Sequence, residues 1–136
     1  MKEAILLERE STNAIIGAFF EVYNNLGFGF LENVYSLALE RELLSRGRVV
    51  GREVPIPITY KGDFLTYHRA DIVVDEKVIV EIKATEILPT FTRRQVLNYL
   101  RATRLEVALV LHFGPEAKFH RIVSTMKQDS RESGSS

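Results

Sequence analysis

The sequence predicts an α/β fold in which helices flank a mixed sheet. Apolar residues recur at helical spacing in the first third of the chain, and the spacing then changes to two, as in strands. A further helical segment separates the third expected strand from the fourth, and a helix in that place allows a parallel crossover. The chain has 136 residues, 46% of them hydrophobic and 26% charged, which is typical of one globular domain.

The first third of the chain predicts two helices. Residues 11–26 form the first, with Ser11 or Thr12 as its N-cap, and residues 31–45 form the second, which Gly47 stops. A glycine-broken connection separates the two. The apolar positions that define the first helix are Ile15, Phe19, Val22 and Leu26.

Three strands joined by short turns are expected next. The first, residues 53–60, alternates apolar and polar side chains, but Pro55 and Pro57 remove two backbone donors on one side. This strand is therefore expected at an edge of the sheet. The remaining elements are strands at residues 65–74 and 78–84, a helix at 91–103, and strands at 106–113 and 118–123.

The composition excludes several classes of protein. The chain has no cysteine, which excludes disulfides, thiolate catalysis and iron–sulfur clusters. No apolar run reaches the roughly 18 residues that a membrane span needs, and the first residues are too acidic for a signal peptide. We therefore expect a cytoplasmic protein with no membrane partner. Residues 1–126 are expected to form one domain, followed by a disordered polar tail at residues 127–136.

Charge is balanced overall but not locally. Eighteen basic and eighteen acidic residues give a formal net charge of zero, so the overall field of a strong nucleic-acid binder is missing. Residues 87–105 nevertheless contain no acidic residue. Such a segment can lie against phosphate or form a solvated helix face. Its four arginines are Arg93, Arg94, Arg101 and Arg104.

Two acidic residues face each other in the expected hairpin of residues 69–83. The wholly apolar set of each strand has even residue numbers, so the two sets face one core only if each cross-strand pair of residue numbers has an even sum. A turn centred on Glu76 meets this condition and pairs Asp71 with Glu81. Directly opposed Cβ atoms lie about 4.5 to 5.5 Å apart, so the carboxylates repel unless a cation or a proton lies between them. Lys83 points to the same side. The pattern fits a metal site, or a solvent-facing sheet in which Lys83 pairs with one of the acids.

Glu32 lies in the first turn of the second expected helix, at the head of an apolar stripe. At helical spacing it shares a face with Tyr35, Leu39 and Leu43, so a half-buried carboxylate in need of a partner is expected. Backbone amides at the helix N-terminus would also satisfy it. On the later helix, Gln95 and Tyr99 lie one turn apart, a pair that by itself most often marks the boundary between core and solvent.

Together these motifs resemble the PD-(D/E)XK nuclease superfamily, and more narrowly its GxxExxY group with the QxxxY variant of RecB-type nucleases. The resemblance covers residues 6–123, and Ala70 stands where the superfamily has a proline that is not a ligand. The matching motifs are Gly29 to Tyr35 for GxxExxY, Asp71 for the superfamily aspartate, Glu81 to Lys83 for ExK, and Gln95 to Tyr99 for QxxxY.

The resemblance implies an αβββαβ core, preceded here by an extra N-terminal helix, and a site for Mg²⁺ or Mn²⁺. The implied ligands are Asp71, Glu81 and the Ile82 carbonyl, with Glu32 assisting. Lys83 would orient or deprotonate the attacking water, and Gln95 would steady the site. The residues expected to contact substrate are Tyr35, Arg69, Arg93, Arg94 and Tyr99.

A metal-dependent nuclease that hydrolyses phosphodiester bonds in DNA or RNA is therefore expected. The alternative is a non-catalytic nucleic-acid-binding or oligomeric assembly module that retains the nuclease fold, because a fold can outlive its chemistry. The neutral net charge argues against tight unaided DNA binding. A homo-oligomer would join two arginine-rich segments into one basic channel. A third alternative is a domain that binds a small molecule or a protein partner.

Overall fold

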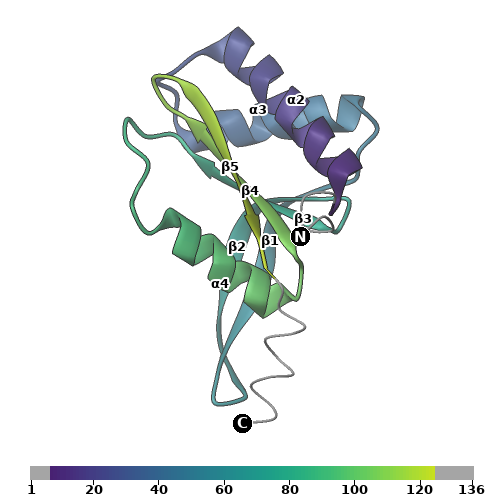
Figure 1. Cartoon of the computed structure of the whole chain (residues 1–136), viewed down its shortest axis with the longest axis vertical. Helices are drawn as coiled ribbons and strands as arrows, with labels where there is room; N and C mark the ends of the chain where they lie inside the picture. Colours follow the sequence, from purple (N-terminus) through teal and green to yellow (C-terminus); the bar gives the residue numbers. More distant parts are fainter. Residues whose placement is uncertain (1–6, 125–136) are drawn as a thin grey trace.

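A computed structural model describes residues 7–124, which form a five-stranded sheet with helices on both faces (Figure 1). The expected polar tail at residues 127–136 lies outside the described residues. None of the helices within residues 7–124 is long and apolar enough to span a membrane. The elements in chain order are α2 (Arg9–Leu26), α3 (Glu32–Ser45), β1 (Val50–Tyr60), β2 (Asp63–Val74), β3 (Val78–Lys83), α4 (Thr92–Thr103), β4 (Val107–Phe113) and β5 (Ala117–Val123).

The sheet is mixed, as predicted. Its strands lie in chain order, β1-β2-β3-β4-β5; β3 and β4 are parallel, and the other three pairs are antiparallel. The parallel pair follows from α4, which carries the chain back across one face between β3 and β4. The strand with Pro55 and Pro57, β1, lies at an edge. The α/β fold class with a mixed sheet between helices is thereby confirmed.

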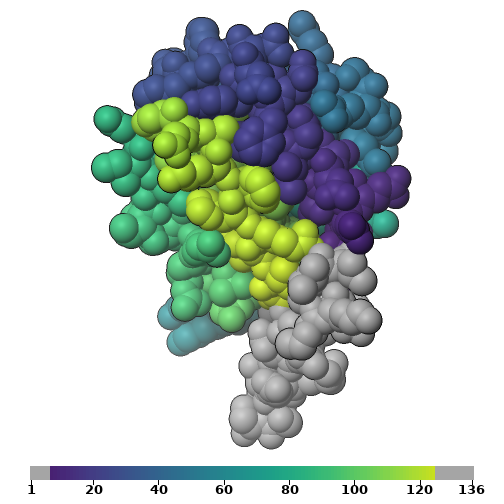
Figure 2. All heavy atoms as spheres, turned by 45° about the horizontal axis from the view of Figure 1, so that its top comes forward, coloured from purple at the N-terminus to yellow at the C-terminus, as the bar shows by residue number. Residues whose placement is uncertain are grey.

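Each face of the sheet has its own core. Helices α2 and α3 cover one face, where Phe19, Leu39 and Leu109 belong to one buried cluster. Helix α4 covers the other face, where Leu100 and Val110 belong to a second cluster. Strand β4 lies between the clusters and is buried at all seven residues. In the space-filling view, yellow β5 reaches the surface between the N-terminal helices and green α4 (Figure 2).

The start of the first helix differs from the prediction. Helix α2 begins at Arg9 with Glu8 as its N-cap, so neither Ser11 nor Thr12 is the cap. The hydroxyl of Ser11 instead donates a hydrogen bond of 2.6 Å to Oδ2 of Asp75 in the β2–β3 turn. This hydroxyl is buried against a distant turn, so a tertiary contact takes the place of the local cap that the sequence suggests.

The β2–β3 hairpin has the register that the parity argument predicts. Its pairs include Ile72 with Val80 and Val74 with Val78, which sum to the same even number as Asp71 and Glu81. The turn has three residues, 75–77, and Asp75 and Glu76 both have positive φ angles of 57°. The hairpin therefore holds its apolar set toward α2 and α3.

The β1–β2 pair turns over at Asp71. Ile72 belongs to the cluster beneath α2 and α3, whereas Ala70 belongs to the cluster beneath α4. Regular alternation would place both on one face. The neighbouring strand is irregular at the same level, because Glu53 has a φ angle of 54° between the pairs Arg52–Ile72 and Val54–Ala70. Asp71 thus lies where the alternation of β2 breaks. On either side of it, even-numbered residues face opposite helix layers.

Candidate active site

Strands β2 and β3 bring Asp71, Glu81 and Lys83 together. The Nζ atom of Lys83 lies 3.3 Å from Oε2 of Glu81. The backbone amide of Ile82 donates a hydrogen bond of 2.7 Å to Oδ2 of Asp71, which fixes that carboxylate beside residues 81 and 82 of the next strand. The residues behind this group are fully buried: Ile72, Val80 and Ile82. The arrangement is the one expected from the alternation of the hairpin.

Glu81 is a buried acid whose charge is only partly compensated. Its residue is 6% exposed, and its Oε1 atom has no hydrogen-bond partner among the described residues. Burial and, after it, the negative charge of Asp71 raise the pKa of Glu81 to about 7, although Lys83 acts in the opposite direction. Burial likewise raises the pKa of Asp71, while the Ile82 amide and Lys83 oppose the rise. The two acids therefore favour a bound cation or a shared proton.

The donor set fits a hard divalent cation with several waters. Mg²⁺ is usually held by one or two carboxylates and keeps several waters, and Asp71 with Glu81 supplies such a pair. The unpartnered Oε1 of Glu81 is an oxygen that a cation would satisfy. Within residues 7–124, however, no three His, Cys, Asp or Glu side chains converge as one metal-binding group. The carboxylates that lie together are therefore those of Asp71 and Glu81.

Glu32 lies at the rim of the site and is exposed, so the expectation of a half-buried, inward-facing acid is wrong. It is the first residue of α3, and burial of this helix begins only at Tyr35, one turn later. It still lines a cavity of about 260 Å³ together with Asp71, and its charge contributes to the raised pKa of Glu81. The full lining is Glu32, Asn33, Ser36, Arg52, Glu53, Asp71 and Ile82.

Arg52 is a residue of this cavity that the sequence argument missed. Its Nη1 donates a hydrogen bond of 3.1 Å to Oγ of Ser36, and its Nε lies 3.4 Å from Oε1 of Glu40. Both partners are on α3, so Arg52 ties the edge strand β1 to the helix that carries Glu32. Arg52 lies near the irregular start of an edge strand, and nothing in the sequence there predicts its contact with α3.

Tyr35 is a structural residue, which corrects its assignment to substrate contact. It is 0% exposed, and its ring stacks on Phe113 at 4.1 Å between centroids. Its hydroxyl donates a hydrogen bond of 2.6 Å to the carbonyl of Gly27 and accepts one of 3.2 Å from the amide of Phe30. Tyr35 therefore holds the loop between α2 and α3, and the motif tyrosine cannot reach a substrate.

Tyr99 lies against the acid pair from the α4 side. Its residue is 9% exposed, and burial, followed by the charges of Glu81 and Asp71, raises its pKa. Its ring stacks on the imidazole of His68 at 3.8 Å and 13°. Gln95, one turn earlier on α4, is partly buried. The structure thus brings Tyr99 to the site and adds His68, which the sequence argument did not identify.

His68 belongs to the same polar group. Its Nε2 atom is buried without a hydrogen-bond partner among residues 7–124, and burial together with the positive charge of Lys83 lowers its pKa. Because His68 and Ala70 alternate on β2, both face α4. The alternation could have revealed the face of His68, but its stacking on Tyr99 depends on how α4 docks.

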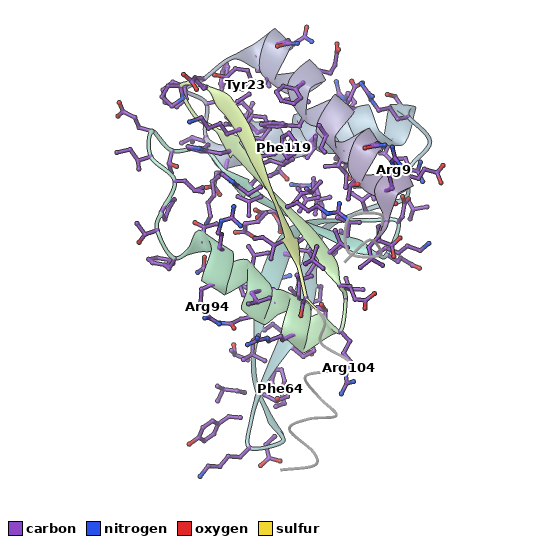
Figure 3. All side chains as sticks on the ribbon, viewed as in Figure 1. Arg9, Tyr23, Phe64, Arg94, Arg104 and Phe119 are labelled. Atoms are coloured by element: carbon purple, nitrogen blue, oxygen red, sulfur yellow. The ribbon has the colours of Figure 1, made fainter. Side chains whose placement is uncertain are left out.

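The three arginines expected to contact substrate are all exposed and do not line the cavity. Arg93 and Arg94 lie in the first turn of α4, where Nη2 of Arg93 is 3.3 Å from Nδ1 of His120. Arg69 lies on β2, two residues before Asp71. Figure 3 shows Arg94 and Arg104 at opposite ends of α4. These three arginines therefore lie outside the cavity lining.

The raised pKa of Glu81 predicts how the stability of the metal-free protein depends on pH. The folded protein holds this proton up to about pH 7, whereas the ordinary value for the side chain is 4.5. Between these values the folded state binds more protons, so the free energy of unfolding is expected to fall as pH rises, by on the order of 2 to 3 kcal/mol. Urea denaturation in EDTA measures this fall, which Glu81→Gln should remove. An equal fall in both proteins would contradict the assignment.

The chain is similar to a known structure in fold and to a known protein family in sequence. The fold is similar to the crystal structure of SSO0001, with a TM-score of 0.55 and 18% sequence identity over 94% of this chain and 64% of that chain. This chain thus spans less than two thirds of that protein, and at this identity the likeness concerns the fold alone. No curated protein matches the sequence. Residues 9–123 match the PD-(D/E)XK nuclease superfamily, and because that match spans most of the sequence, the chain belongs to this superfamily.

Proposed function

We propose that this protein is a metal-dependent nuclease that hydrolyses phosphodiester bonds at Asp71, Glu81 and Lys83. The observation that carries the proposal is the buried Glu81 carboxylate, which has one oxygen without a hydrogen-bond partner among residues 7–124 and lies beside Asp71. Membership of a superfamily of nucleases supports the same conclusion. An acid pair of this kind is unfavourable in a purely structural role, because like charges repel more strongly where water is excluded.

Each residue has a distinct part in the proposed reaction. Asp71, Glu81 and the carbonyl of Ile82 would hold Mg²⁺ or Mn²⁺, and Glu32 would influence the site from the rim of the cavity. The bound ion would supply positive charge at the phosphate and make water more acidic. Lys83, held 3.3 Å from Glu81, would orient the attacking water and accept its proton or stabilise charge on the phosphate. Tyr99 and Gln95 would shape the α4 side of the site.

Cleavage of labelled nucleic acids tests the proposal directly. Single-stranded and duplex DNA and RNA are incubated with the protein and either Mg²⁺, Mn²⁺ or EDTA. We expect products in at least one metal-containing reaction, no products in EDTA, and none with Asp71→Asn in either metal. A protein that binds nucleic acid but cuts none of these substrates would instead favour the non-catalytic binding module. Products that persist in EDTA would point to a contaminating or unrelated activity.

A further inference from the structure

The outer half of the β1–β2 hairpin extends past α4 (Figure 1). This part of the hairpin presents large apolar side chains to solvent. A two-residue turn closes it, with Lys61 and Gly62 both at positive φ, as a tight hairpin turn requires. Phe64 is visible on this hairpin in Figure 3. The exposed apolar residues and their exposed fractions are Tyr60 at 62%, Phe64 at 59%, Leu65 at 61% and Tyr67 at 59%.

A bulge gathers two of these rings on one face. Residues three apart on a regular strand point to opposite faces. The register shifts between Ile58 and Thr59, whose partners are Thr66 and Phe64, so Leu65 is the additional residue. This additional residue turns the side chains of Phe64 and Tyr67 to the same face, where their ring centroids lie 4.8 Å apart.

This face continues along β2 toward the acid pair. His68 and Ala70 face α4, so Tyr67 and Arg69, which alternate with them, face away from α4. That is the side on which Asp71, where the alternation breaks, lines the cavity beside α3. The step from Tyr67 to Asp71 is about 13 Å at the rise of a strand. The one acid near the tip, Asp63, pairs with Tyr60 and so lies on the opposite face from its neighbour Phe64. We call Phe64, Tyr67 and Arg69 the aromatic face.

We propose that the aromatic face binds an unpaired nucleic-acid strand and leads it to Asp71. Bases would stack on Phe64 and Tyr67, and a phosphate would lie against Arg69. Stacking on aromatic side chains needs base faces that a duplex already covers, so the face selects single-stranded over double-stranded substrate. This inference rests on the proposed nuclease function, because it assigns the substrate class of the same site.

A second copy of the chain fits this surface less well. Strand addition requires free donors along the edge of β1, and Pro55 and Pro57 remove two of them opposite Arg69 and Tyr67. Two copies that met through their aromatic faces would also bring the two Arg69 cations toward each other. A polyanion with flat bases complements both the charge and the rings.

Fluorescence anisotropy in EDTA tests binding without cleavage. The probes are a labelled oligothymidylate, the matching uridine oligomer and the thymidine strand annealed to its complement. We expect the parent to bind a single strand more tightly than the duplex, and Phe64→Ala and Tyr67→Ala each to weaken single-strand binding by about fivefold or more. Tyr67→Phe should bind as the parent does. Tyr60→Ala is the matched control, because this ring is equally exposed but lies on the other face.

The outcomes separate this inference from the proposed function. If Phe64→Ala and Tyr67→Ala bind as the parent does, or if Tyr60→Ala weakens binding equally, the aromatic face is not the binding surface. If the parent cuts nucleic acid and both alanine variants cut single strands at the parental rate, the inference fails and the nuclease function stands. If the parent binds through these rings and cuts nothing, the nuclease function fails and the binding surface stands. Light scattering that shows a dimer, lost in Phe64→Ala, would assign the face to a second copy and overturn the inference.

Discussion

Millimolar Mg²⁺ or Mn²⁺ is expected to raise the melting temperature of the parent protein, and Asp71→Ala or Glu81→Ala is expected to abolish the rise. The reason is that the two acids lie together away from solvent, and that Oε1 of Glu81 has no hydrogen-bond partner in the described part of the chain. An ion that binds only the folded state stabilises it by RT ln(1 + [L]/Kd), about 2.7 kcal/mol at a hundredfold excess over Kd. Thermal melts with and without metal at pH 8 measure the effect.

The same melts contain their own control. Without metal at pH 8, Glu81→Ala should be as stable as the parent or more stable, because a buried charge and its repulsion from Asp71 are removed. Glu116→Ala should leave the metal-induced rise unchanged, since this carboxylate is exposed on the β4–β5 turn. A parent whose melting temperature does not respond to metal would argue against the site. A rise that survives in Asp71→Ala would place the ion elsewhere.

Lys83→Ala is expected to lower the rate of cleavage by roughly a hundredfold or more and to leave the metal-induced rise in melting temperature in place. The side chain contacts Glu81 and carries no ligand oxygen, so its removal takes away a proton acceptor or a positive charge near the phosphate. Because Lys83 lowers the pKa of Glu81, its removal is expected to raise that pKa, so the two proteins should be compared over a pH series that extends well above pH 8.

Two further variants make the Lys83 experiment specific. Lys77→Ala, on the exposed turn of the same hairpin, should cut at the parental rate. Lys83→Arg keeps the charge but cannot give up its proton, so activity in this variant would assign Lys83 an electrostatic role, and loss of activity would support a role as base. Parental activity in Lys83→Ala would refute both roles. Loss of the metal response in that variant would show that Lys83 instead holds the acids in place.

The sequence predicted the acid pair because side chains on a strand alternate between its two faces with a period of two residues. If Ile72 and Val80 face one core, the register of the whole hairpin is fixed without reference to the rest of the molecule. The observed register confirms this prediction. The edge position of β1 follows equally from Pro55 and Pro57, because each proline removes a donor whatever surrounds it. These predictions succeeded because they rest on covalent geometry and on parity.

The predictions that failed depend on tertiary packing. The exposure of Glu32 depends on how far α3 projects beyond the sheet at its first turn, and helical spacing carries no information about this. The burial of Tyr35 follows from its place in the apolar stripe, yet its motif suggested a substrate contact. The stacking of His68 on Tyr99 joins residues from β2 and α4 and exists only after the helix has docked.

The three-residue turn between β2 and β3 has a consequence for the order of folding. Asp71 and Glu81 belong to one hairpin, so closing the chain between them costs little entropy. The parallel pairing of β3 with β4 requires closure of a longer segment that includes α4. The acids are therefore expected to meet first in water, where their repulsion is weak, and α4 is expected to remove that water afterwards. Repulsion between the acids thus opposes the late docking of a helix and leaves the early formation of the hairpin almost unaffected.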